Sequence, residues 1–485
     1  MTRSLRVAFA LALLAPLLSA TPAGAAPLRF GPCPSEGPDE PGVECAQIAV
    51  PLDYNAPDGR TISIAISRVR ASGSPEEYRG ALLVNPGGPG GAGLNYAVAK
   101  RGKMPESVQR AYDIIGFDPR GVGHSNPVDC GPLGGLFDHP GPEPVPSTVP
   151  QERDYLNRLR AMAGDCREHA GAVSVFINTM NTARDMERIR RALHEPVLNF
   201  LGVSYGSYLG AAYAAEYPGH VGRMVLDSVV SPDRWHDFDT QQAFAMLRQR
   251  DVLFRWIADH PSLDLGSTPE AVHGQYSRAR AALAENPLRG TFGPSEFDHL
   301  VYRVLSRTER WEPFARALSA YVHTGNGDGF APEMPESDQE SRNYEAALRT
   351  VKCADSTRPS TAEVIGAVRA LRSVDPQPVL TGFEAATCRY WPQPRETARL
   401  GHPAMPAVLL TQASHDPTTP YPGAKRMQAV LPGSRMVVLR NGYSHGVFAS
   451  QQNPCVDQTT AAYLVAGTVP PRDVDCQGLG LPAVN

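Results

Sequence analysis

The pentapeptide Gly202-Val203-Ser204-Tyr205-Gly206 places a serine between two glycines, where the apolar run VLNFLGV gives way to the helical pattern YLGAAYAAE. A serine on such a strand-to-helix turn is exposed for nucleophilic attack, and the flanking glycines leave room for its strained backbone. The alternative is an ordinary turn that needs glycine and contains a serine by chance. The pattern alone does not distinguish a catalytic serine from an ordinary turn. The distinction depends on whether the chain also contains the residues that a catalytic serine needs as partners.

A catalytic serine needs a base, and the base needs a group that orients it. When the serine follows a strand in this way, the acid and then the histidine come later in the chain, each after a further strand. Asp416 in QASHDPTTPY follows the apolar segment 407–412, and His445 in NGYSHGVF follows the segment 434–441. Both would lie at the carboxyl ends of parallel strands, where the crevice of an open sheet lies. We predict Ser204 as nucleophile, Asp416 as acid and His445 as base.

Asp227 is an alternative acid, because it follows the strand next after the nucleophile. We prefer Asp416, because the loop that contains Asp416 and the loop that contains His445 lie on either side of a single unit, which contains one expected strand. Taken singly, His445 fits a surface-loop histidine and Asp416 fits an Asx turn before a proline. Their order along the chain after Ser204 favours the catalytic interpretation.

The glycine-rich segment NPGGPGGAG at 85–93 follows the apolar segment 81–84. Acyl transfer needs hydrogen-bond donors for the developing oxyanion, and glycines let main-chain N–H groups approach a substrate closely. We expect one donor at the N–H of Tyr205 and the second at Gly88, with Gly87 as the alternative. A phosphate-binding loop is the competing interpretation, but the pattern G-x-x-x-x-G-K-[ST] is absent.

Apolar runs and helical patterns alternate in two parts of the chain, which predicts a mostly parallel sheet with helices on both faces. The expected strands are 45–52, 61–69, 80–85, 112–119, 197–203, 223–230, 407–412 and 434–441, and the expected helices between them include 182–193 and 208–216. From about residue 235 to 394 the periodicity is helical, at 241–259, 269–285, 295–306, 311–323, 339–351 and 362–373. The predicted fold is α/β, with one sheet interrupted by a helical cap insertion.

The N-terminal residues have the form of a secretory signal peptide: Arg3 and Arg6 precede an apolar run at 7–18, and a small-residue cleavage site ends at Ala25. No later run is long enough for a transmembrane helix, and no cysteine follows the apolar run closely, so we expect an exported chain without a membrane anchor. The predicted division is a signal peptide at 1–25, the first part of the core at 26–232, the helical cap at 233–400 and the C-terminal part of the core at 401–485.

The mature chain is expected to be a soluble protein held by disulfides. The sequence has 485 residues, 42% hydrophobic, with a net charge of −4 and no basic run, which argues against nucleic acid or an anionic membrane as partner.

Eight cysteines in an exported chain suggest an oxidised framework, and they permit about 105 connectivities. We predict pairing in sequence order: Cys33–Cys45, Cys130–Cys166, Cys353–Cys388 and Cys455–Cys476. The alternative, a metal site, lacks any C-x-x-C or Cys/His cluster with ligand spacing, so no metal or cofactor is predicted.

Several segments together resemble one family: NPGGPGGAG, GFDPRGVGHS, NTMNTARDMERIRRAL, GVSYGSYLGAAYAAEYPGHVGRMVLDSVVSP, and HDPTTP followed by NGYSHG. The chain resembles the secreted tripeptidyl aminopeptidases of actinomycetes, which are relatives of proline iminopeptidase among the α/β-hydrolase serine peptidases. The resemblance covers nearly the whole mature chain and includes VKCAD at 351–355 and CRYWP at 388–392. It implies an α/β-hydrolase fold and the same catalytic roles for Ser204, Asp416 and His445.

One departure from that family pattern concerns specificity. Proline iminopeptidases carry a histidine before Gly-Gly-Pro-Gly, where this chain has Asn85-Pro86. The resemblance therefore implies release of longer peptides, and we expect an exported serine aminopeptidase that frees tripeptides from peptides with a free N-terminus through an acyl-enzyme. No cofactor is required, and a monomer is expected.

An aminopeptidase must also bind the α-ammonium of its substrate, for which a carboxylate of the cap is the natural partner. The candidates are Glu309, Glu312, Asp355 and Glu345; the alternative for each is a solvated helix face. Two other functions compete with the peptidase. A carboxylesterase or lipase acting on small acyl esters uses the same triad, and a binding protein on a hydrolase scaffold predicts that Ser204 does not react with a fluorophosphonate.

Overall fold

The protein is described by a computed structural model that covers residues 28–35, 37–333, 338–378, 383–391 and 396–484. The predicted signal peptide at 1–25 lies outside these residues. The centre of the structure is a nine-stranded sheet in the order β1-β2-β4-β3-β5-β6-β7-β8-β9. Its strands are β1 Val43–Pro51, β2 Thr61–Val69, β3 Ala81–Asn85, β4 Asp113–Phe117, β5 Leu198–Val203, β6 Val221–Asp227, β7 Leu409–Ala413, β8 Arg435–Arg440 and β9 Val474–Gln477.

The sheet is mostly parallel, as predicted. β1 pairs with β2 and β2 with β4 in antiparallel fashion, and every pair from β4–β3 to β8–β9 is parallel. Because the carboxyl ends of β5, β6, β7 and β8 therefore point the same way, the loops that follow them meet at one edge. These are the loops that carry Ser204, Asp416 and His445.

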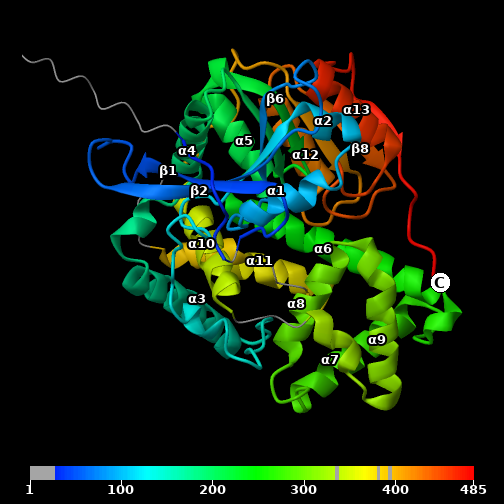
Figure 1. The fold of residues 1–485 in the computed structure, drawn as a ribbon. Coiled ribbons are helices and arrows are strands. Elements are labelled where there is room, and N and C mark those ends of the chain that lie inside the picture. The colour runs from blue at the N-terminus through cyan, green and yellow to red at the C-terminus, as the bar shows by residue number, and fades with distance from the viewer. Residues whose placement is uncertain (1–27, 36, 334–337, 379–382, 392–395, 485) are drawn as a thin grey trace, which may run out of the picture.

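Helices cover both faces of the sheet (Figure 1). They are α1 Leu94–Arg101, α2 Glu106–Ala111, α3 Val149–His169, α4 Thr179–Ala192, α5 Tyr205–Glu216, α6 Trp235–Ala258, α7 Pro269–Glu285, α8 Pro294–Leu305, α9 Trp311–Thr324, α10 Gln339–Asp355, α11 Thr361–Val374, α12 Tyr421–Val430 and α13 Pro454–Ala466. Successive residues of a strand point to opposite faces. Phe200 of β5 accordingly belongs to the hydrophobic cluster that includes residues of α4, α5 and α12, whereas its neighbour Leu201 belongs to the cluster that includes residues of α1, α2 and α13.

The helices α6 to α11 lie between β6 and β7 in the chain and gather with α3 on one side of the molecule, below the sheet in Figure 1. Several of them share a separate hydrophobic core, which includes Leu253, Phe297 and Trp311. The expected helices at 269–285 and 311–323 coincide closely with α7 and α9. The long helix α3 and the short strand β9 were not predicted.

Four disulfides join the cysteines in the predicted order: Cys33–Cys45, Cys130–Cys166, Cys353–Cys388 and Cys455–Cys476. The third links the end of α10 to the short 3-10 helix η7 (Glu384–Tyr390). Throughout the described ranges, every helix is too short or too polar to cross a membrane.

Candidate active site

Ser204 lies on a strained turn between β5 and α5. Its φ of 59° and ψ of −124° are unfavourable for a residue with a side chain, and strain of this kind is stored where function requires it. The surrounding backbone holds the turn in place. Ser204 N donates to the carbonyl of Asp227 at 2.9 Å, and the Ser204 carbonyl accepts from Ser207 Oγ at 2.6 Å.

Packing explains both glycines of the pentapeptide. A Cβ on Gly202 would lie 2.2 Å from the carbonyl oxygen of Gly206, and a Cβ on Gly206 would lie 2.8 Å from Oδ1 of Asn85. Real Cβ atoms do not approach backbone or well-packed atoms this closely. The strand, the turn and the helix can pack this tightly around Ser204 only because both positions lack side chains.

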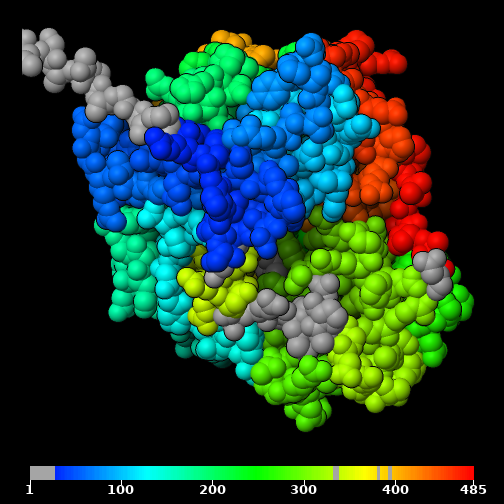
Figure 2. Space-filling view, in the orientation of Figure 1, coloured from blue at the N-terminus to red at the C-terminus, as the bar shows by residue number. Residues whose placement is uncertain are grey.

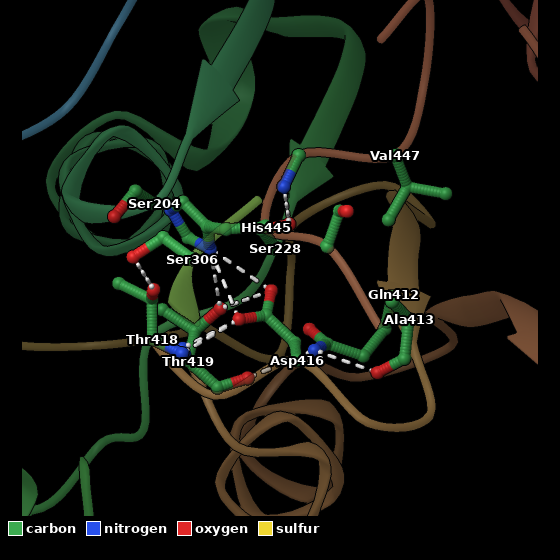
Figure 3. A network of polar contacts seen from close by, with 12 residues as sticks. Ser204, Ser228, Ser306, Gln412, Ala413, Asp416, Thr418, Thr419, His445 and Val447 are labelled. Carbon is green, nitrogen blue, oxygen red and sulfur yellow. Dashed lines mark hydrogen bonds and ion pairs between the residues drawn. The ribbon is translucent and has the colours of Figure 1, made fainter. Parts of the chain in front are cut away.

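His445 and Asp416 form a buried pair next to Ser204 (Figure 3). His445 Nδ1 lies 2.9 Å from Oδ2 and 3.1 Å from Oδ1 of Asp416, whose side chain is fully buried. A carboxylate only accepts hydrogen bonds, so Nδ1 carries the proton, and Nε2 of the neutral imidazole is an acceptor. The imidazole lies between the Asp416 carboxylate and Ser204 in Figure 3, which suits a base for the serine hydroxyl.

The Asp416 carboxylate is held by its own loop. Its Oδ1 accepts from the main-chain N–H groups of Thr418 and Thr419, each at 2.9 Å, and its Oδ2 accepts from Thr419 Oγ1 at 2.9 Å. These donors satisfy a buried charge that would otherwise be unfavourable. They also fix the direction from which the carboxylate meets His445.

Asp227, the alternative acid, has a different set of partners. It is fully buried and accepts from Thr411 Oγ1 at 2.8 Å and from the main-chain N–H of Val447 at 3.1 Å. Burial raises the pKa of this carboxyl above its ordinary value. Asp227 thus supports the backbone of the loop that carries His445, and the carboxylate that contacts the imidazole belongs to Asp416.

The helical segment also contacts this loop. The carbonyl of Ser306, just after α8, accepts from the main-chain N–H of His445 at 2.9 Å. The hydroxyl of Ser306 accepts from Thr418 Oγ1 at 3.2 Å, as Figure 3 shows. Residues of the helical segment therefore help to place both loops of the Asp416–His445 pair.

The glycine-rich loop passes directly over Ser204. A Cβ on Gly87, whose φ is +96°, would lie 2.9 Å from Ser204 Cβ and 3.1 Å from Tyr205 N. Gly88 lines the same cavity as Ser204. Tyr205 begins α5, where main-chain N–H groups have no acceptor within the helix. Donation to an oxyanion by the N–H groups of Tyr205 and Gly88, with Gly87 as the alternative, stays a prediction.

Ser204 and His445 open into a cavity of about 260 Å³. Part of its wall is apolar, formed by Val230, Trp235, Phe238 and Leu348, and part is charged, formed by Lys352 and Glu384. Figure 2 shows a hollow between the N-terminal part of the chain, in blue, and the helices in green and yellow. Tyr344 lines both the cavity and a surface cleft beside the glycine-rich loop, so the two adjoin.

The charged wall contains two carboxylates against one ammonium group. Lys352 Nζ donates to Asp239 and to Glu384, each at 2.8 Å, and the exposed fraction of its side chain is only 5%. Burial raises the pKa of Asp239 to about 7. Burial also acts to raise the pKa of Glu384, but the positive charges of Lys352 and Arg349 hold it below its ordinary value. The cavity therefore presents an ionised carboxylate at neutral pH.

The four carboxylates predicted to bind a substrate amine lie elsewhere. The side chain of Glu309 is 63% exposed, Glu312 pairs with Arg316, and Glu345 pairs with Arg349. Asp355 is buried and accepts hydrogen bonds from Thr179. None of the four is among the residues that line the cavity of Ser204 and His445.

Nothing in the local sequence around Glu384 marks it as a site residue. Its position depends on tertiary contacts: the Cys353–Cys388 disulfide joins η7 to α10, which brings Glu384 next to Lys352. The only available signal was its place four residues before the CRYWP segment. Within the described residues, no group of three or more His, Cys, Asp or Glu side chains is arranged to hold a metal ion.

Comparisons with known proteins give one family. Residues 80–449 match the family model described as the alpha/beta hydrolase fold. The chain is 35% identical over 451 residues to the tripeptidyl aminopeptidase of Streptomyces lividans, covering 90% of this chain and 83% of that protein. It is 29% identical over 485 residues to the serine protease Hip1 of Mycobacterium bovis, covering 93% and 91%. It is also 29% identical over 461 residues to carboxylesterase B of Mycobacterium tuberculosis, covering 90% and 86%.

Proposed function

Because the chain belongs to the alpha/beta hydrolase family, we propose that it is a serine aminopeptidase that releases short peptides, chiefly tripeptides, from free N-termini. One observation supports this proposal most directly: Ser204, His445 and the ionised carboxylate of Glu384 line the same cavity. The similarity to a tripeptidyl aminopeptidase supports the length of the released peptide.

In the proposed mechanism Ser204 Oγ attacks the carbonyl carbon of the scissile peptide bond while His445 Nε2 takes its proton. Asp416 stabilises the imidazolium that forms. The N–H groups of Tyr205 and Gly88 donate to the oxyanion, and losing one such donor costs about 3 kcal/mol of transition-state stabilisation. His445 then protonates the leaving amine. A water molecule, deprotonated by the same imidazole, hydrolyses the acyl-enzyme and frees Ser204.

Glu384 is the proposed partner of the substrate α-ammonium. Above pH 7, where Asp239 is ionised as well as Glu384, the cluster of Asp239, Lys352 and Glu384 carries one net negative charge. Arg349 lies close enough to lower the pKa of Glu384, but it is already paired with Glu345. A bound ammonium group would balance the remaining charge through charge-assisted hydrogen bonds. A neutral, N-acetylated substrate would leave that charge unbalanced in a buried site.

We further propose that the segment 233–400 acts as a cap over the site and that 26–232 and 401–485 form the catalytic core. The position of α6 to α11 between β6 and β7, with a core of their own, supports this division. The signal-peptide pattern ending at Ala25 and the four disulfides support an exported protein. The proposed substrates are peptides with a free N-terminus, and the proposed acting form is a monomer.

The test compares a tripeptidyl nitroanilide with its N-acetylated form. The protein should hydrolyse the free form and lose most of its activity on the blocked form. The Ser204→Ala variant should hydrolyse neither. Equal rates on the two forms would contradict the aminopeptidase proposal while leaving a serine hydrolase in place.

A carboxylesterase acting on small acyl esters is the second candidate, because one relative is named carboxylesterase B and the same triad serves ester hydrolysis. This candidate predicts faster turnover of nitrophenyl acyl esters than of any tripeptidyl nitroanilide. It also predicts no effect of N-acetylation. The same set of substrates therefore separates the two functions.

A further inference from the structure

The side chain of Tyr205 is tethered by a chain of buried hydrogen bonds. Tyr205 Oη lies 2.6 Å from Thr179 Oγ1, which in turn donates to Asp355 Oδ2 at 2.6 Å. The main-chain N–H of Thr179 donates to Asp355 Oδ1 at 2.9 Å. Tyr205, Thr179 and Asp355 are 2%, 0% and 1% exposed, so water does not compete for these bonds. Asp355 thus uses both carboxylate oxygens within the protein.

When Asp355 is ionised, every hydroxyl in this chain of hydrogen bonds must donate toward its carboxylate. A carboxylate has no hydrogen to donate, so the Thr179 hydroxyl must give its only hydrogen to Asp355. The Tyr205 hydroxyl must then donate to Thr179 Oγ1. Each hydroxyl in such a chain polarises the next, which strengthens the bonds in a buried environment. Above pH 7, where Asp355 is ionised in the folded chain, its charge therefore acts on the Tyr205 side chain through Thr179.

Each of the three residues lies at the end of a helix. Tyr205 is the first residue of α5, Thr179 is the first residue of α4, and Asp355 is the last residue of α10. The chain of bonds therefore joins the turn that carries the nucleophile to a sheet-covering helix and to the helical segment. The Cys353–Cys388 disulfide, two residues before Asp355, fixes this end of α10 to η7.

We propose that Asp355 is a positioning residue for the reaction: through Thr179 it holds the Tyr205 side chain, and so it orients the main-chain N–H of Tyr205 toward the oxyanion. This inference rests on the proposed function, in which that N–H is an oxyanion donor. The tether adds to the hydrogen bonds that hold the strained backbone at Ser204, because a strained conformation persists only where its surroundings determine it. An oxyanion donor acts only if its direction is set before the reaction.

The role differs from the one expected for Asp355 from the sequence. As a ligand for the substrate amine it would line the cavity, which it does not. As a positioning residue it needs no contact with the substrate. Its effect should therefore appear in the chemical step and in the affinity for transition-state analogues, and KM should change little.

The test uses Tyr205→Phe and Asp355→Asn, with Tyr208→Phe as a matched control. Tyr208 lies on the same helix, is also buried and stacks with Tyr205 at 6.5 Å between ring centroids, but its hydroxyl takes no part in this chain of bonds. Tyr205→Phe keeps the ring and the main-chain N–H and removes the tether alone. The measurements are kcat and KM on a tripeptidyl nitroanilide and the inhibition constant of a tripeptide aldehyde, whose adduct with Ser204 places an oxyanion in the hole.

Both variants should lower kcat by about threefold to tenfold, the range expected from one net hydrogen bond. They should weaken the aldehyde by a similar factor and leave KM within about twofold. The double variant should be no slower than the slower single variant, because both substitutions break the same chain. Tyr208→Phe should match the wild type in all three measurements.

The inference is overturned if Tyr205→Phe matches Tyr208→Phe in kcat and in aldehyde affinity, or if the effects of the two single variants multiply in the double variant. Should Asp355→Asn fail to fold, Thr179→Val combined with Tyr205→Phe makes the same comparison. Ser204→Ala separates this failure from a failure of the proposed function. If that variant stays active, the peptidase mechanism itself is wrong; if it is inactive while Tyr205→Phe is normal, only the tether is refuted.

Discussion

Replacing Glu384 by glutamine tests how the protein recognises a free N-terminus. The substitution removes one negative charge and changes the side-chain volume very little. Lys352 keeps Asp239 as a partner at 2.8 Å, so its buried ammonium group is not left unpaired. Above pH 7, where Asp239 is ionised as well as Glu384, the net charge of the cluster formed by Asp239, Lys352 and Glu384 changes from −1 to zero. A substrate ammonium then has no charge to balance.

The size of the effect follows from the bond that is lost. A hydrogen bond to a charged group contributes about 1.5–3 kcal/mol, and about 1.4 kcal/mol corresponds to a tenfold change. We therefore expect kcat/KM on a free tripeptidyl nitroanilide to fall about 10- to 150-fold in Glu384→Gln. Hydrolysis of a small nitrophenyl ester, which has no ammonium group, should stay within about twofold.

The assay is the ratio of kcat/KM for the free and the N-acetylated substrate. In Glu384→Gln this ratio should fall to near one. Glu309→Gln is the matched control, because it removes a carboxylate from the same helical segment at a side chain that is 63% exposed. If Glu384→Gln keeps the wild-type ratio, or if Glu309→Gln loses it, our assignment of the amine-binding carboxylate is wrong.

Three further predictions concern the triad, the nucleophile turn and a buried acid. Asp416→Asn should lower kcat about 10⁴-fold, because the catalytic imidazole loses the carboxylate that fixes its tautomer. Asp227→Asn should mainly lower the melting temperature. A larger loss of kcat in Asp227→Asn than in Asp416→Asn would reverse the two roles. Gly206→Ala should abolish fluorophosphonate labelling, because its Cβ would lie 2.8 Å from Asn85 Oδ1. Labelling of Gly206→Ala at the wild-type rate would contradict the packing argument. The control Gly366→Ala adds a Cβ that meets nothing within 4 Å outside its own helix, so it should raise helix stability by up to about 1 kcal/mol. Burial raises the pKa of Asp355 from 3.8 to about 7, so between these values the folded chain holds a proton that the unfolded chain has released, and stability falls as pH rises. Urea unfolding across this range should show a smaller loss of stability with pH in Asp355→Asn than in the wild type, and equal slopes would refute the shift.

Much of the fold could be predicted because its signals are local. The strands β3, β4 and β5 are buried on both faces, so each forms a continuous apolar run that is recognisable without its neighbours. The nucleophile turn is similarly local, since its glycines are required by contacts within a few residues of Ser204 and with Asn85. The order of Ser204, Asp416 and His445 along the chain then follows from the strand order.

The features that were not predicted depend on contacts between distant segments. The strand β9 is four residues long and lies at the edge of the sheet, where pairing with β8 creates it and no apolar run marks it. Glu384 reaches the cavity through the Cys353–Cys388 disulfide and Lys352. Asp355 was assigned to the substrate because burial of a single carboxylate at the end of a helix leaves no trace in the sequence.

The proposed function is tested most directly by the products from an unmodified peptide of about ten residues with a free N-terminus. Mass spectrometry should show the N-terminal tripeptide and the complementary fragment with the wild type, and only intact peptide with Ser204→Ala. Internal fragments without a tripeptide would contradict cleavage from the N-terminus. The same products from Ser204→Ala would contradict the role of Ser204 as the nucleophile.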